Sequence, residues 1–210
     1  MMNKLKALFI ICAAAVCAVS CGEKPADNAA DAPSDKADAV TTEAQPASES
    51  VDIPAEAEKA LKEFAESSIS GDVDTMLKRM YPENMIDAME KAGIKQEFAV
   101  AVSGSVGGKL NGFSIDGCTR LSDEAILKAE NYYESFAAGL QTDTATFKIN
   151  DGYSLNMNID MELNGESGSF SDPVSVVLID GDGWKLIPAS EQDLLEMGQQ
   201  QEQTQASSES

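Results

Sequence analysis

Histidine is missing from this sequence of 210 residues. Its absence removes the commonest general base of enzymes and a usual zinc ligand, so the familiar catalytic triads and most zinc sites are excluded. Basic residues are scarce as well, because 15 Lys and Arg stand against 36 Asp and Glu, a formal charge of −21. A surface this acidic repels phosphate backbones, and the sequence therefore predicts no nucleic-acid partner.

Long apolar runs are lacking except at the start of the chain. The positive charge of this first segment is on Lys4 and Lys6, and residues 5–19 are otherwise almost all small or apolar. The run is shorter than the roughly 20 residues that a transmembrane helix needs. A short basic start, an apolar centre and small residues before a cleavage point are typical of a secretory signal, which we expect over residues 1–20.

Cysteine occurs only four times, and one copy ends the apolar run. Ala18-Val19-Ser20-Cys21 resembles the lipobox of bacterial lipoproteins, with Ala18 in place of the commoner Leu. The resemblance implies cleavage before Cys21, lipidation of its sulfur and a membrane anchor on the extracytoplasmic side. Two or three acyl chains make such an anchor stable, whereas one chain is marginal. An ordinary secretory signal that happens to contain cysteines is the alternative.

The remaining cysteines limit the chemistry of the mature chain. Cys12 and Cys17 would leave with the signal, and Cys21 would carry lipid. Cys118 then remains alone, so the sequence predicts neither a disulfide framework nor a metal cluster, and we expect no cofactor. Without a histidine to lower its pKa, Cys118 is better interpreted as a small buried residue than as a nucleophile.

Two segments have the composition of unstructured chain. Residues 22–52 contain no Leu, Ile, Phe, Met, Trp or Tyr, and residues 199–210 are polar and of low complexity. Such segments bury too little apolar surface to offset chain entropy. We therefore expect a lipidated, disordered acidic linker over 21–52, one folded domain over 53–198 and a disordered tail over 199–210.

The first half of this domain has helical periodicity. We expect a helix from Ile53-Pro54 to Gly71, a second capped by Asp72 and a third after Tyr81-Pro82. Ser122 is expected to cap a further helix, while residues 94–112 fit a helix or a loop. The apolar stripes are Ala57, Ala60, Leu61, Phe64, Ala65 and Ile69, then Val73, Met76, Leu77 and Met80, then Met85, Ile86 and Met89, and last Ile126, Ala129, Tyr133 and Phe136.

The second half predicts an antiparallel sheet, which makes the fold class α+β. Strict alternation over 153–163 indicates a strand with one buried face. We favour a kink at Asp151-Gly152 over a hairpin there, because the kink keeps Ile149 on the face of Tyr153. We also expect strands over 113–120, 174–179 and 184–187, a turn at Asn164-Gly165 and a short helix over 190–197.

The stretches "SISGDVDTMLKRMYP" and "VSVVLIDGDGWKLIP" are similar to the helical opening and the final strand of the nuclear transport factor 2-like superfamily. The resemblance spans about residues 55–188. It implies N-terminal helices packed on a curved, cone-shaped antiparallel sheet with an apolar pocket. Members include isomerases, dehydratases and ligand carriers, so the fold alone does not settle an activity.

Methionine and aromatic residues supply the candidate ligand site. Methionine adapts to irregular apolar ligands but also fills cores, and both interpretations stay open. The candidate pocket walls are Phe64, Met76, Met80, Tyr81, Tyr133, Met157, Met161 and Trp184.

Two other kinds of chemistry have partial signals in the sequence. Asp180, Asp182 and Glu191 occur at spacings similar to a calcium loop, although a β-turn explains "DGDGW" more simply. An isomerase- or hydrolase-like enzyme would need a pocket carboxyl beside a tyrosine. The chain has tyrosines for this role at Tyr81, Tyr132, Tyr133 and Tyr153, but shows no inward Asp or Glu on a strand.

The sequence thus predicts a membrane-anchored extracytoplasmic lipoprotein. Its domain is expected to be a non-catalytic module that holds a small apolar ligand, a peptide or a protein partner, with the enzyme as the alternative. A further hypothesis is assembly, such as a homodimer, through an outer sheet face on which Val177 and Ile179 add apolar surface.

Overall fold

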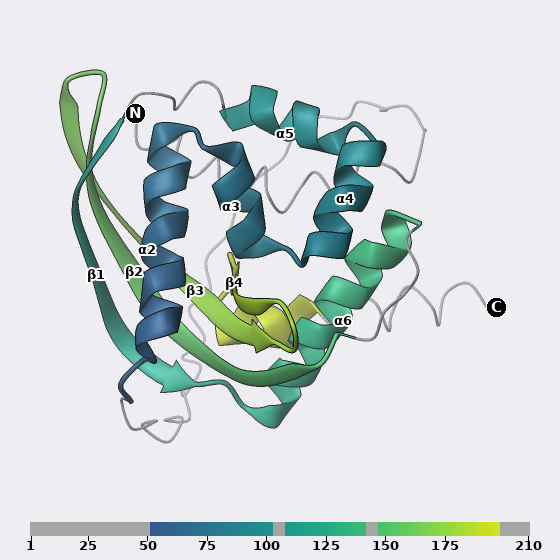
Figure 1. Ribbon diagram of the computed structural model, residues 1–210. Helices are drawn as coiled ribbons and strands as arrows, with labels where there is room; N and C mark the ends of the chain where they lie inside the picture. The colour runs from purple at the N-terminus through teal and green to yellow at the C-terminus, as the bar shows by residue number, and fades with distance from the viewer. Residues whose placement is uncertain (1–50, 103–107, 142–146, 198–210) are drawn as a thin grey trace, which may run out of the picture.

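The computed structural model describes residues 51–102, 108–141 and 147–197, and confirms the α+β class. Helices come first and an antiparallel sheet follows (Figure 1). The elements are α2 (Ala55–Ser70), α3 (Val73–Met80), α4 (Glu83–Lys91), α5 (Ile94–Val102), β1 (Lys109–Arg120), α6 (Asp123–Gly139), β2 (Ile149–Leu163), β3 (Glu166–Ile179) and β4 (Gly183–Ile187). A short helix over 191–197 closes this part of the chain.

The sheet holds four antiparallel strands in the order β1-β2-β3-β4. Figure 1 shows the long strands curving around α2, which contacts β1, β2 and β4. Among the described residues, no helix combines the length and the apolar character that crossing a bilayer requires.

Local signals place the helix boundaries where the sequence predicts them. Gly71 ends α2 with a φ of 79°, a left-handed conformation that costs glycine little. Asp72 then caps α3, since its carboxylate accepts hydrogen bonds from the backbone N–H and the hydroxyl of Thr75 at 3.1 and 2.7 Å. Ser122 caps α6 by accepting from the N–H of Ala125. Capping chemistry therefore fixes where these helices begin and end.

The strands are longer than the sequence predicts. Within residues 94–112, which fit a helix or a loop by sequence, Ile94–Val102 form α5 and residues 109–112 begin β1. In β3 the ladder begins at Glu166 rather than 174, although the added residues are mostly Ser, Gly, Asp and Pro. Asn164 and Gly165 have φ values of 57° and 81° and form a tight turn that pairs Leu163 with Glu166. Pairing with β2 thus overrides weak strand propensity in β3.

The predicted kink in β2 is confirmed, but one expected consequence was wrong. The bulge lies between Ile149, which pairs with Ile179, and Asp151, which pairs with Leu178. One extra residue exchanges the faces of a strand, so Ile149 lies on the face opposite Tyr153 rather than beside it. Both residues are nevertheless buried, because both faces of the sheet are covered at this end.

The proposed outer apolar face was also wrong, since Val177 and Ile179 are buried. Leu121, just before α6, and Ile126, in the first turn of α6, pack over this face. Both crowd Gly152, where an added Cβ would lie 2.7 and 2.8 Å from their Cδ1 atoms and 3.3 Å from a Val177 methyl. The start of α6 therefore covers the surface on which the assembly hypothesis depended.

Candidate functional site

The predicted pocket walls lie in one continuous hydrophobic cluster. Within that cluster six of the eight side chains are almost fully enclosed and two are partly exposed. The enclosed residues are Phe64, Met76, Met80, Tyr81, Tyr133 and Met157, and the partly exposed ones are Met161 and Trp184.

The helical part of this cluster is held by specific contacts. The Tyr133 hydroxyl donates a hydrogen bond to the Met80 carbonyl at 3.0 Å, which satisfies a polar group at the end of α3. Tyr81 stacks on Phe136 with ring centroids 5.0 Å apart. Burial raises the pKa of Tyr133 well above 10, so this hydroxyl stays protonated as a donor. These side chains act first as core residues.

A second group of side chains meets where β2 bends, and we call it the Arg120 corner. It consists of Arg120 at the end of β1, Asp151 and Tyr153 on β2, and Trp184 on β4. Arg120 pairs with Tyr153 across β1 and β2, while Asp151 and Trp184 both pair with Leu178 of β3. Neighbouring strands therefore bring a cation, a carboxylate and two aromatic rings to one sheet face.

Hydrogen bonds define the geometry of the Arg120 corner. The Tyr153 hydroxyl donates to Asp151 Oδ2 at 2.9 Å, and the Arg120 guanidinium lies 3.4 Å from both the carboxylate and the hydroxyl. The guanidinium carbon lies 5.7 Å from the centroid of the Tyr153 ring. On the same ring, Trp184 packs with centroids 5.9 Å apart. Tyr153 is thus the centre of the corner.

Exposure differs sharply between these side chains. Tyr153 is 4% exposed, whereas the Arg120 and Asp151 side chains are 67% and 25% exposed. The hydrogen bond that Arg120 donates to the Tyr153 hydroxyl and the nearby Asp151 carboxylate raise the pKa of Arg120, which keeps the guanidinium charged. Exposed ion pairs and exposed cation–π contacts are weak. The Arg120 guanidinium is therefore held loosely, whereas Asp151, Tyr153 and Trp184, which we call the frame of the corner, are held more firmly.

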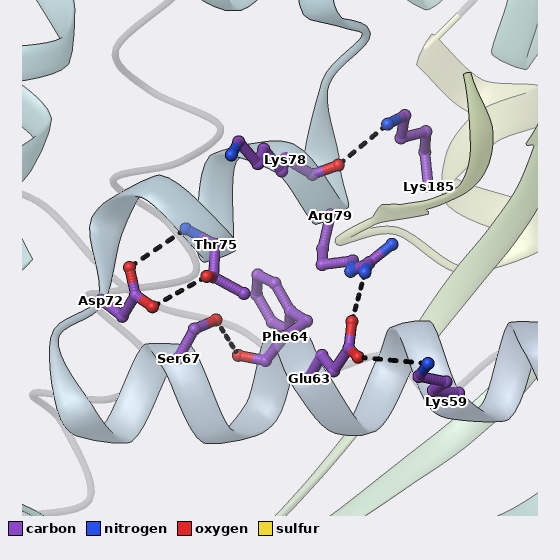
Figure 2. A network of polar contacts seen from close by, with 9 residues as sticks. All are labelled: Lys59, Glu63, Phe64, Ser67, Asp72, Thr75, Lys78, Arg79 and Lys185. Carbon is purple, nitrogen blue, oxygen red and sulfur yellow. Dashed lines mark hydrogen bonds and ion pairs between the residues drawn. The ribbon is translucent and has the colours of Figure 1, made fainter. Parts of the chain in front are cut away.

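A separate polar network joins α2, α3 and β4 (Figure 2). Lys185 is only 6% exposed, and its ammonium donates to the Lys78 carbonyl at 2.9 Å near the end of α3. Burial lowers the pKa of Lys185 below 10.5, although Asp182 opposes the shift. Arg79 forms an ion pair with Glu63, which also lies 3.9 Å from a lysine ammonium one turn away. This network ties the helical layer to the edge of the sheet.

Two of the three residues at calcium-loop spacing, Asp182 and Glu191, accept hydrogen bonds at helix N-termini. Asp182 accepts from the N–H of Glu83 at the start of α4, at 3.0 Å. Glu191 accepts from both the N–H and the hydroxyl of Ser122 at the start of α6, at 3.0 and 2.6 Å. Over residues 51–102, 108–141 and 147–197, no group of three His, Cys, Asp or Glu side chains is arranged to hold a metal.

Cys118 is buried, as the sequence predicts. Burial raises the pKa of its thiol, and the nearby Asp52 carboxylate adds to the shift. A raised pKa keeps the sulfur protonated and poorly nucleophilic. The Cys118 carbonyl accepts a hydrogen bond from the Val51 N–H at 3.0 Å, which attaches the beginning of the described chain to β1.

Sequence reasoning missed Asp151 and Arg120. Asp160 and Glu162 are exposed, in agreement with the outward carboxylates that the sequence predicts for this strand. Asp151, however, lies two residues before Tyr153 on the same strand. That spacing was a usable signal, because residues i and i+2 share a strand face. Arg120 could not be placed without the register between β1 and β2. Cys21 lies outside the described residues.

No protein-family model, no curated protein and no solved structure matches this chain.

Proposed function

We propose that the chain is a lipid-anchored protein on the extracytoplasmic side of a bacterial membrane, and that its domain is a binding module. The anchor is Cys21, in the lipobox-like stretch that ends the apolar run. One observation carries the proposal: Cys21 ends the apolar run, and a strongly polar segment separates it from the domain that contains α2. Residues 22–50 hold no large apolar side chain other than Val40, whereas Val51 already bonds to β1 and α2 begins at Ala55.

The intervening segment fits the role of a tether. A flexible chain of this length spans about 30 Å on average, and its acidic residues extend it further. Its low content of large apolar residues gives it little reason to pack on the domain. The domain would therefore sample the space next to the membrane, where it meets ligands or partner proteins.

For the fold we propose a nuclear transport factor 2-like cone. Three observations support it: helices come first, a long antiparallel sheet curves around α2, and Gly183-Trp184-Lys185-Leu186 form the final strand (Figure 1). On this proposal the layer between the helices and the sheet is the place for a small apolar ligand. The methionine-rich cluster described above lines that layer.

A binding role is favoured over an isomerase- or hydrolase-like enzyme by the surroundings of one carboxyl group. Asp151 is a strand carboxylate that accepts a hydrogen bond from a tyrosine, and it lies partly exposed beside Arg120. An enzyme of the proposed type would instead hold its carboxyl in an apolar, water-excluding pocket. The exposed position suits recognition of a partner.

Metabolic labelling with an alkyne analogue of palmitate tests the anchor. The wild-type chain should take up the label, Cys21→Ala should lose it, and the matched variant Cys17→Ala should keep it. Labelled protein should also be digested by protease added outside the cytoplasmic membrane. Equal labelling of Cys21→Ala, or protection from the protease, would refute the proposal.

A further inference from the structure

The Arg120 corner contains both a receptor and an occupant. Tyr153 donates to Asp151 at 2.9 Å, so the carboxylate is fixed by a strand neighbour, and Trp184 packs beside the same ring. Arg120 occupies this frame through contacts of 3.4 Å and a stack at 5.7 Å, with 67% of its side chain exposed. The frame is preorganised and its occupant is weakly held.

We propose that Asp151, Tyr153 and Trp184 form a receptor for the guanidinium group of an arginine in a cationic peptide or protein, and that Arg120 is the resident group this ligand displaces. The inference deepens the binding role proposed above and rests on it. The chain itself demonstrates that a guanidinium fits, because Arg120 meets the carboxylate, the hydroxyl and the ring face together.

Charge and shape both favour an arginine ligand. The chain carries a formal charge of −21, and a field of this sign attracts cationic partners and raises their rate of encounter. A planar guanidinium can stack on an aromatic ring and bond a carboxylate at the same time, whereas an ammonium is a compact, strongly hydrated point charge. The corner should therefore prefer arginine over lysine at equal charge.

The resident side chain reduces the affinity for the ligand. While Arg120 lies over Tyr153, the receptor is unavailable, and the apparent dissociation constant equals the intrinsic constant divided by the fraction of chains in which the receptor is free. Because Arg120 is exposed at the end of β1, it can swing into solvent without opening the core. The arginine of a partner would then take the same place.

The chain offers a direct probe, because Trp184 is its only tryptophan. Titration of the full chain, purified in mild detergent, with tetra-arginine should change the Trp184 fluorescence, and tetra-lysine should do so only at much higher concentration. Arg120→Ala should lower the Kd for tetra-arginine several-fold. Lys109→Ala, at the other end of β1, removes the same charge and should change it far less.

Substitution of the Asp151 carboxylate provides a second test of the receptor. Asp151→Asn should weaken tetra-arginine binding several-fold, while Glu166→Gln, at the exposed start of β3, should leave the Kd nearly unchanged. Circular dichroism should show that each variant is folded. If Asp151→Asn and Glu166→Gln weaken tetra-arginine binding equally, or if tetra-lysine binds as tightly as tetra-arginine, general charge attraction explains the binding. Either result overturns the inference.

Failure of the corner and failure of the anchor can be told apart. If the chain carries no lipid but its Trp184 fluorescence still responds to tetra-arginine, the proposed anchor is refuted and the proposed receptor stands. If the lipidated chain binds the peptide by calorimetry but its Trp184 fluorescence does not change, the peptide binds away from the Arg120 corner. That second result would overturn the receptor and leave the anchor intact.

Discussion

The carboxylate of Asp182 accepts a hydrogen bond from the backbone N–H of Glu83 at 3.0 Å. The two residues are 99 positions apart, and the bond joins the turn between β3 and β4 to the first turn of α4. A helix N-terminus has unpaired N–H groups and a partial positive charge, so an incoming carboxylate satisfies both. This contact fixes the helical layer relative to the sheet.

Removing that cap should destabilise the domain. We expect Asp182→Ala to lower the free energy of unfolding by about 1 kcal/mol, the usual cost of losing an N-cap acceptor. Asp182→Asn should retain most of the stability, because the amide oxygen can still accept. Urea denaturation at pH 7 measures both. The control is Asp180→Ala, two residues earlier on the exposed part of the same turn, and a loss as large as that of Asp182→Ala would contradict the capping role.

A methyl group at Gly152 should destabilise the domain, because neighbouring side chains must move to admit it. Its missing Cβ leaves room for Leu121 and Ile126, and a methyl group there would lie 2.7–2.8 Å from them. Overpacking of this kind costs about 1–3 kcal/mol, so Gly152→Ala should lower the urea midpoint clearly. Gly168→Ala is the matched strand variant, since nothing lies within 4 Å of its added Cβ. Equal effects of the two substitutions would show that α6 does not pack on the sheet at this point.

Lys185 should give the domain a distinct dependence on pH. Burial lowers its pKa in the folded state below 10.5, so the unfolded chain binds more protons between the folded pKa and 10.5. Stability rises with pH wherever the unfolded state binds more protons. The stability of the wild type relative to Lys185→Met should therefore increase as pH rises towards 10.5.

This difference is best measured by urea denaturation of both proteins across that range. Subtraction removes groups common to both chains, including Tyr133, whose raised pKa acts in the opposite direction at high pH. A difference that stays constant or falls with rising pH would mean that the Lys185 ammonium is not desolvated in the folded protein.

The sequence predicted the elements that depend on neighbouring residues. Gly71 and Asp72 mark a helix end and a helix start through local backbone chemistry, and the alternation over 153–163 indicates a strand because one face is buried. Asn164-Gly165 forms the expected turn for the same local reason. Such signals need no knowledge of the rest of the fold.

Features set by distant contacts could not be predicted in this way. The early start of β3 depends on its pairing with β2, and the burial of Val177 depends on the side chains from the start of α6. The Arg120 corner needs the registers of several strands at once, because Arg120 and Tyr153 are 33 residues apart. The methionine stripes predicted a buried layer correctly, but periodicity does not separate a ligand cavity from a filled core.

The central claim is the acylated cysteine, and the mass of the N-terminal peptide tests it most directly. Protein isolated from its native cells should yield a first peptide that begins at Cys21, with a diacylglyceryl group on the sulfur and two or three acyl chains in all. A peptide that retains residues 1–20, or one that starts at another residue with the Cys21 sulfur unmodified, would contradict the account.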